Sequence, residues 1–188
     1  MERLLIIGPG DVARRALPEL TARYAATALV RGVPPAPGIA AVAGDLDRPD
    51  SLAPLAGAAD VVLHAAPPAE SGTRDDRTRA LIATLSGARM LPRRVVYLST
   101  SGVYGDCGGA RVDESRPLAP QTDRARRRAD AETALGEWGR ARGVEIAILR
   151  VPGIYAADRL PLERLRQRTP VLRTEDDGYT NHIHADDL

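Results

Sequence analysis

The sequence predicts an α/β fold, a doubly wound parallel sheet of the Rossmann type. Short apolar runs of strand length alternate with longer segments of helical period, and a glycine-rich turn follows the first run. The runs are hydrophobic throughout, which is typical of parallel strands buried on both faces. Strands that alternate with helices imply right-handed crossovers, which place helices on both faces of the sheet.

The individual elements follow from this pattern in chain order. Strands are expected over residues 4–7, 26–30, 40–43, 61–65, 95–99 and 144–149. Helices are expected over residues 12–24, 51–56, 73–90 and 123–142. Segments 105–122 and 151–182 are rich in Pro, Gly and charge, and are expected to form loops past the strand ends, where this architecture builds its substrate sites.

Composition excludes several classes of function. The net charge of +1 predicts no general attraction to nucleic acid or to a membrane surface. The chain has no apolar run of about 18 residues and no basic leader, so neither a membrane span nor a signal peptide is expected. The single cysteine, Cys107, fits a cytoplasmic location. His182 and His184 lack the further ligands of a zinc site, so no metal is expected.

The strongest motif lies between the first expected strand and the first expected helix. Residues 8–13 read Gly-Pro-Gly-Asp-Val-Ala, the pattern G-x-G-x-x-A. Gly8 permits a tight turn, Gly10 lets the backbone approach a diphosphate, and Ala13 lets the helix pack near the strand. The helix N-terminus offers free N–H groups to phosphates. The motif predicts dinucleotide binding by Gly8, Gly10, Asp11, Val12 and Ala13.

The end of the second strand indicates which dinucleotide is preferred. An acidic residue there would bind the adenosine ribose hydroxyls of NAD, but the strand is followed by Arg31. A guanidinium can pair bidentately with a 2′-phosphate, so NADP is expected in preference to NAD. The alternative is a solvated surface arginine.

Two further strand ends extend the expected cofactor site. Asp45, followed by Leu46, places a carboxylate after the third strand, where it could accept a hydrogen bond from the adenine amino group. The fourth strand ends in small residues that leave room for a ribose and the diphosphate. The expected cofactor-binding residues here are Asp45, Leu46, His64, Ala65 and Ala66, although a lone histidine is more often packed than functional.

Taken together, these motifs resemble the extended and atypical short-chain dehydrogenase/reductases, which include NAD-dependent epimerases and dehydratases. Residues 96–105, 113–120, 150–155 and 183–188 continue the resemblance in the family's order. The resemblance implies an NAD(P)-binding domain over residues 1–150 and the start of a substrate-binding region over 151–188, with the native chain continuing beyond it. It also implies cofactor contacts from Ser99, Thr100, Pro152, Gly153 and Ile154, and substrate contacts from Ser101 and Tyr104.

The family's catalytic pair is missing. The family uses a Ser or Thr with Tyr-x-x-x-Lys; Thr100 matches the former, but alignment on Ala131-Glu132 places Arg124 and Arg128 at the tyrosine and lysine positions. Arginine cannot act as an acid or base because its pKa lies above about 12. Arg128 could still hold a ribose or phosphate; the alternative is that the arginines of 124–128 form an exposed basic run. The departure resembles the atypical subgroup.

Two functions remain open at this level. One is an NAD(P)-dependent oxidoreductase or epimerase-like enzyme, in which Thr100 orients an oxygen of a small carbonyl, alcohol or nucleotide-sugar-like substrate. The other is a non-catalytic NADP sensor or scaffold. The chain contains no lysine, since all 26 basic residues are arginines, so a lysine mechanism is excluded. Substrate, proton donor and oligomeric state stay open, a homodimer included.

Overall fold

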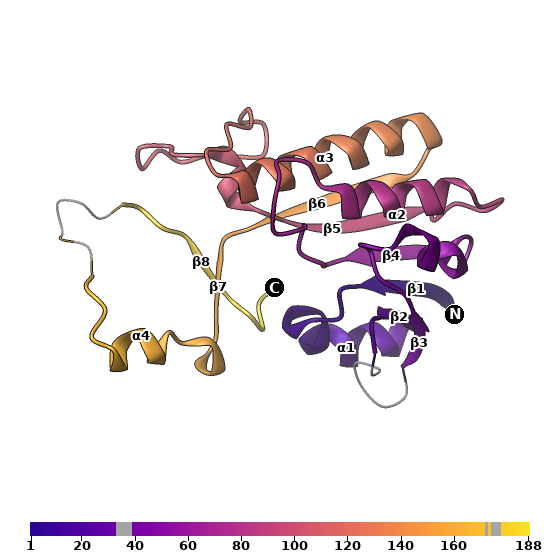
Figure 1. Ribbon diagram of the computed structural model, residues 1–188, viewed down its shortest axis with the longest axis horizontal. Helices are drawn as coiled ribbons and strands as arrows, with labels where there is room; N and C mark the ends of the chain where they lie inside the picture. The colour runs from indigo at the N-terminus through magenta and orange to yellow at the C-terminus, as the bar shows by residue number, and fades with distance from the viewer. Residues whose placement is uncertain (33–38, 172, 174–177) are drawn as a thin grey trace.

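A computed structural model describes residues 1–32, 39–171, 173 and 178–188. Its centre is a parallel six-stranded sheet in the order β3-β2-β1-β4-β5-β6 (Figure 1). The strands are β1 Glu2–Ile7, β2 Tyr24–Val30, β3 Ala40–Ala43, β4 Val61–His64, β5 Arg94–Thr100 and β6 Glu145–Val151. The predicted doubly wound fold is confirmed.

The strand order reverses between β1 and β4. The chain first runs outward from β1 through β2 to β3, and then returns to add β4, β5 and β6 on the other side of β1. Ile7 at the end of β1 pairs with both Leu29 of β2 and His64 of β4. In open α/β sheets a crevice forms at the carboxyl ends of the strands where the order reverses, which is the usual place for a ligand.

The helices cover both faces of the sheet and give it two hydrophobic cores. Helix α1 (Asp11–Arg23) covers one face; α2 (Asp76–Ser86) and α3 (Asp123–Arg142) cover the other (Figure 1). Successive strand residues point to opposite faces, so Ile6 packs in the α1 core while Ile7 packs in the α2–α3 core. No helix in the described part of the chain is long and apolar enough to cross a membrane.

The predicted helix over 73–90 is shorter in the structure. It begins at Asp76, because the Asp75 side chain accepts a hydrogen bond from the Thr78 N–H at 3.1 Å and caps the first turn, and it ends before Gly87. The predicted helix over 51–56 is the 3-10 helix η1 (Pro49–Leu55). The remaining predicted strands and helices differ from the observed ones only near their ends.

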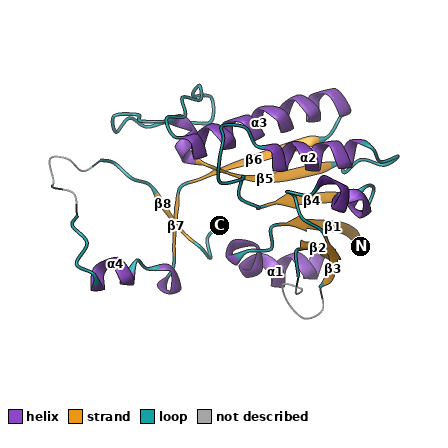
Figure 2. Cartoon of the chain, viewed as in Figure 1, coloured by secondary structure: helices purple, strands orange, loops and turns teal. Residues whose placement is uncertain are grey.

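Two excursions leave the sheet beyond β5 and β6. The first follows the 3-10 turn η2 (Ser101–Tyr104) and continues to α3. The second, here called the C-terminal arm (residues 152–188), contains β7 Gly153–Tyr155, η3 Ala157–Arg159, α4 Leu162–Arg166 and β8 His182–His184, and its other described residues are mostly loop (Figure 2). Strands β7 and β8 pair in parallel and are separate from the main sheet.

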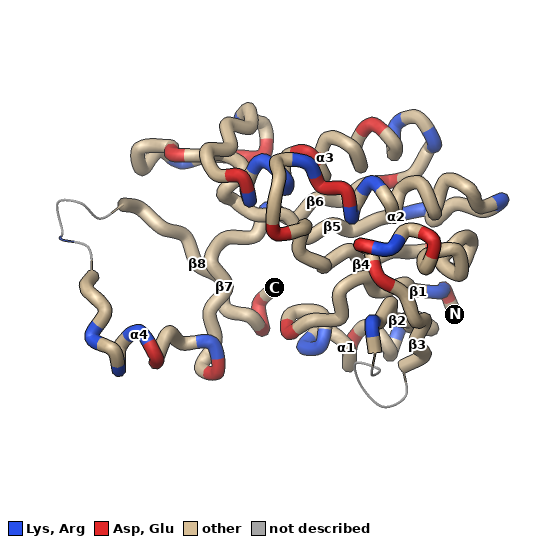
Figure 3. Tube along the Cα trace, viewed as in Figure 1, with Lys and Arg blue, Asp and Glu red and all other residues tan. Residues whose placement is uncertain are grey.

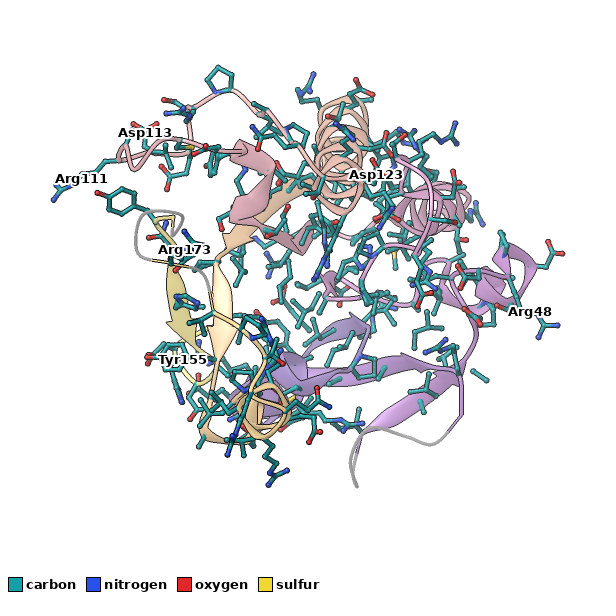
Figure 4. All side chains as sticks on the ribbon, turned by 60° about the vertical axis from the view of Figure 1, so that its left-hand side comes forward. Arg48, Arg111, Asp113, Asp123, Tyr155 and Arg173 are labelled. Atoms are coloured by element: carbon teal, nitrogen blue, oxygen red, sulfur yellow. The ribbon has the colours of Figure 1, made fainter. Side chains whose placement is uncertain are left out.

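The two excursions lie on the same side of the molecule. Figure 4 shows Arg111 and Asp113 at the tip of the first excursion and Tyr155 on the arm, away from Arg48 on the opposite side. A Cβ added to Gly109 would lie 2.4 Å from the Tyr179 ring, so the loop and the arm are in contact. The boundary at residue 150 stays a prediction, since β6 ends at Val151 and the arm follows directly.

Candidate cofactor site

Two cavities meet at the glycine turn, at the carboxyl edge of the sheet. The first, of about 330 Å³, lies beyond the ends of β2 and β3, and the second, of about 590 Å³, lies between the start of α1, the end of β5 and the start of α3. Gly8 and Gly10 line both cavities. The two cavities therefore form one groove that crosses the point where the strand order reverses.

Glycine is needed at the two positions of the turn for different structural reasons. Gly8 has a φ of +80°, and a Cβ there would lie 2.5 Å from the backbone N and Cα of Ala66. A side chain at Gly8 would therefore collide with the end of β4. A Cβ on Gly10 would meet only the Gly8 carbonyl oxygen, at 4.0 Å, so the space beside Gly10 is open to the groove.

The first turn of α1 presents free backbone donors to the second cavity. Gly10 is the N-cap and supplies no side-chain cap, and the first intrahelical hydrogen bond runs from the Arg14 N–H to the Gly10 carbonyl at 2.9 Å. The N–H groups of Asp11, Val12 and Ala13 find no acceptor among the described residues, and all three residues line the cavity. These free amides and the positive end of the helix dipole fit a diphosphate.

The first cavity, where the adenosine is expected, is lined by Arg31 and by a second arginine that the sequence analysis did not name. Arg77 lines the first cavity and forms a bidentate pair with Asp47, with Nε 2.7 Å from Oδ1. Hydrogen bonding from Arg77 is the largest cause that lowers the pKa of the Asp47 carboxyl. Arg77 also donates to the Pro67 and Pro68 carbonyls at 3.1 and 3.2 Å, so it ties the loop after β4 to the loop after β3.

The prediction for His64 is wrong. Its side chain is 1% exposed and does not line any of the three cavities described here, because it points into the core beneath the sheet edge. Its Nε2 lies 2.9 Å from the Thr78 hydroxyl, which itself donates to Asp75. The Thr78 hydroxyl therefore accepts, so the His64 proton is on Nε2. Burial, assisted by the charge of Arg128, lowers the pKa of His64 to about 3.

Arg128 does not belong to an exposed basic run. It is 7% exposed, and its Nη1 donates to the Tyr97 hydroxyl at 2.9 Å, the Leu98 carbonyl at 2.8 Å and the Ala66 carbonyl at 3.3 Å. Arg127 is also buried and donates to the Gly72 carbonyl. Only Arg124 and Arg126 of the run are exposed. Arg128 thus crosses from α3 to the ends of β4 and β5, and lines the second cavity.

A buried network supports the end of β5. Glu132 is 4% exposed and accepts hydrogen bonds from Ser99 Oγ at 2.5 Å and from Arg150 Nη2 at 2.9 Å. Arg150 Nη1 donates to the Tyr104 hydroxyl at 2.7 Å. The Ser99 and Tyr104 side chains, expected to meet cofactor and substrate, are therefore engaged within the protein. Tyr104 lines a third cavity, of about 710 Å³, which shares Ser101 with the second.

An ion-pair network joins the arm to the start of α1. Arg15 pairs with Asp158 and Asp186 of the arm, both at 2.8 Å, and with Asp11 at 3.2 Å. Arg159 pairs with Asp11 at 2.8 Å, and its hydrogen bond is the largest cause that lowers the pKa of the Asp11 carboxyl. Charged residues of both signs are interleaved along these elements (Figure 3). Nothing in the sequence pattern indicated this network, because it joins residues over 140 positions apart.

Within the described residues, no group of three His, Cys, Asp or Glu side chains could hold a metal ion.

The other predicted residues lie along the groove. The first cavity is lined by Gly8, Gly10, Arg31, Asp45, Leu46 and Ala66. The second is lined by Asp11, Val12, Ala13, Ala65, Ser99, Thr100, Ser101, Arg128, Pro152, Gly153 and Ile154.

Comparison with known families agrees with this geometry. Residues 8–176 match the model of a family described as NAD(P)H-binding. This chain belongs to the NAD(P)H-binding family. The predicted resemblance to short-chain dehydrogenase/reductases is confirmed, and the family match supports a nicotinamide dinucleotide as the cofactor of this chain. A search of curated proteins finds no match.

Solved structures of family relatives share the fold. A candidate NAD-dependent epimerase/dehydratase from Methylobacillus flagellatus is 28% identical, with TM-score 0.75, over 99% of this chain and 66% of its own. A candidate epimerase from Burkholderia cenocepacia is 26% identical, with TM-score 0.73, over 87% of this chain and 59% of its own. A dTDP-glucose 4,6-dehydratase from Streptomyces venezuelae with NAD bound is 23% identical, with TM-score 0.79, over 98% of this chain and 69% of its own. At this identity the similarity supports a shared fold only. The chain spans less than two thirds of the length of the first two.

Proposed function

We propose that this chain is the cofactor domain of an NADP-dependent oxidoreductase or epimerase-like enzyme. The observation that carries the proposal is the single groove through Gly8 and Gly10, with Arg31 at one end and Thr100 at the other. When bound, the cofactor would donate or accept hydride at its nicotinamide ring. The names of the relatives, which include epimerases and dehydratases of nucleotide sugars, support a small-molecule substrate of a carbonyl, alcohol or nucleotide-sugar-like class.

Thr100 is suited to orient a substrate oxygen. Its Oγ1 accepts from the Gly102 N–H at 3.2 Å and lies at the wall of the second cavity. A hydroxyl that accepts one hydrogen bond still has its O–H to donate. Thr100 can thus direct that proton at a carbonyl oxygen, and the backbone of the η2 turn fixes its position.

No side chain of the tyrosine, lysine or histidine type lines the second cavity in the described part of the chain. Tyr97 does not line this cavity, and burial raises its pKa to about 12. Its hydroxyl accepts a hydrogen bond from Arg128, which does line the cavity. A reaction here therefore requires a proton from the substrate, from water or from a group outside the groove. This feature favours a second candidate, an NADP sensor whose occupancy changes its affinity for a partner.

Cofactor titration tests the proposal. NADPH should bind at least about tenfold more tightly than NADH, the worth of one charge-assisted contact to the 2′-phosphate. Arg31→Gln should remove most of that preference by weakening NADPH alone. Arg48→Gln is the matched control, since Arg48 is exposed on the next loop and lines none of the three cavities. Failure of both cofactors to bind would contradict the proposal, and tighter binding of NADH would contradict the NADP assignment.

Turnover separates the enzyme from the sensor. The purified chain is mixed with NADPH and a panel of carbonyl compounds and nucleotide sugars, and absorbance at the reduced nicotinamide band is followed. Consumption that is lost in Thr100→Val supports the enzyme. Bound NADPH without turnover, together with a partner whose affinity depends on NADP occupancy, supports the sensor.

A further inference from the structure

The end of the second cavity beside Thr100 is strongly cationic. Three arginines line this cavity, Arg124, Arg128 and Arg159, and the only carboxylate among its lining residues is that of Asp11. Asp11 is already paired with Arg15 and Arg159. The two arginines of α3 consequently face the cavity without a carboxylate of their own.

Arg128 carries a buried charge, and none of its bonded partners among the described residues is anionic. Its three acceptors are two backbone carbonyls and a phenol, and no carboxylate of the described residues pairs with it. Nε and Nη2 find no acceptor there either, yet they are not among the fully buried unpaired atoms, which belong to His64, Arg94 and Arg127. Arg128 lines the cavity, so a group bound there can reach its side chain. Removing a cation from water without a counter-charge is costly, so an anion in the cavity would compensate Arg128.

Arg124 lies one helical turn before Arg128 and on the same face of α3. It is exposed and lines the cavity, whereas Arg126, between them, pairs with Asp123 at 2.7 Å and does not line it. The expected diphosphate position is at the N-terminus of α1, whereas Arg124 and Arg128 belong to α3, which forms another wall of the same cavity. The cations of α3 are therefore available to a second anionic group.

We propose that Arg124 and Arg128 hold an anionic group of the substrate, a carboxylate or a phosphate, beside the carbonyl oxygen that Thr100 orients. The planar guanidinium fork matches both groups in bidentate fashion. This inference rests on the proposed function and adds to it the substrate class. It also gives the arginines at the tyrosine and lysine positions a binding role in place of proton transfer.

Anion binding to the NADP-loaded chain tests the proposal. Calorimetric titrations use oxamate as a carboxylate probe, methyl phosphate as a phosphate probe, and oxamide as the neutral counterpart of oxamate. At least one anion should bind and oxamide should not, and the anion that binds identifies the group. Arg124→Gln should weaken that binding at least about tenfold. Arg126→Gln, the matched control on the same helix, should change it by less than about twofold.

A second variant covers Arg128, whose removal could also disturb the strand ends. Arg128→Lys keeps the charge but loses the fork, so it should fold, bind NADP and bind the anion more weakly than the unmodified chain. Binding of neither anion, equal binding of oxamide, an unchanged Arg124→Gln, or an anion that displaces NADP would overturn the inference. NADP affinity is measured first, because its absence would reject the proposed function as well, whereas NADP binding without anion binding would reject the inference alone.

Discussion

The two ends of the second cavity differ in the groups that form them: backbone groups at one end and side chains at the other. One end, where we propose that the diphosphate binds, consists of backbone: a glycine turn and the uncapped amides of α1. The opposite end is formed by side chains with a polar network behind them: Arg128 bonds Tyr97 and two backbone carbonyls, and Glu132 links Ser99 to Arg150. The comparison indicates that cofactor binding depends mainly on backbone geometry. The reaction that the site can support depends instead on which side chains are present.

The largest expected effect concerns the backbone end. Gly8→Ala forces a side chain into a positive φ and into the backbone of Ala66, so the free energy of unfolding should fall by about 2–5 kcal/mol. Gly10→Ala has open space, so it should cost less than about 1 kcal/mol of stability while weakening NADP binding at least about tenfold. Urea denaturation and NADP titration of both variants check this. Equal stability losses would show that the turn has a single structural role.

The backbone end could be predicted from the sequence, and so could the sheet. The motif at residues 8–13 predicts the turn from local sequence alone, since only glycine fits at position 8 beside Ala66. Apolar runs mark the strands most clearly at the centre of the sheet, where β1 and β4 are packed on both faces. The pattern over Asp45 and Leu46 likewise placed two residues in the first cavity.

The side-chain end could not be predicted, for a physical reason. Buried Arg128 and partly buried Arg150 are held by partners 18 to 62 positions away, and such pairings appear only after the chain has folded. Because the chain contains no lysine, every Lys or Arg position is an arginine. The residue type therefore does not distinguish a buried structural arginine from an exposed one. His64 was misplaced because it is the last residue of β4, and its side chain packs in the core against Thr78 and Tyr97.

The side-chain end should be sensitive to the loss of its central carboxylate. Glu132→Ala leaves Arg150 and Ser99 without their shared acceptor, and the free energy of unfolding should fall by about 2–4 kcal/mol. Glu137→Ala, at an exposed position on the same helix, is the control and should change stability by less than about 0.5 kcal/mol. Adding Arg150→Met to Glu132→Ala should recover part of the loss. No recovery would show that Glu132 acts through Ser99 alone.

The core beneath the groove predicts a pH dependence. The pKa of His64 falls from 6.5 to about 3 on folding, so the folded chain prefers the neutral ring. That contribution to stability is fully present above pH 6.5 and is lost as the pH falls, by at most about 1.4 kcal/mol per unit. Between pH 6.5 and 4.5 the carboxylates with lowered pKa values, such as Asp60, stay ionised. Denaturation over this window should show the slope in the unmodified chain and a flatter one in His64→Gln; equal slopes would exclude His64 as the cause.

The smallest expected effect concerns the ion-pair network that docks the arm beside the backbone end. Arg15 is partly exposed and its partners Asp158 and Asp186 are more so, so Arg15→Gln should lower the free energy of unfolding by less than about 1 kcal/mol. Loss of the two ion pairs to the arm should nevertheless loosen it, and trypsin should cleave after Arg159 and Arg164 faster than before. Arg93→Gln, which removes an exposed bidentate pair with Glu2 far along the chain, is the control and should leave those cleavage rates unchanged. Because screening weakens exposed pairs, high salt should give the unmodified chain the cleavage pattern of Arg15→Gln; if it does not, the arm is held by its other contacts.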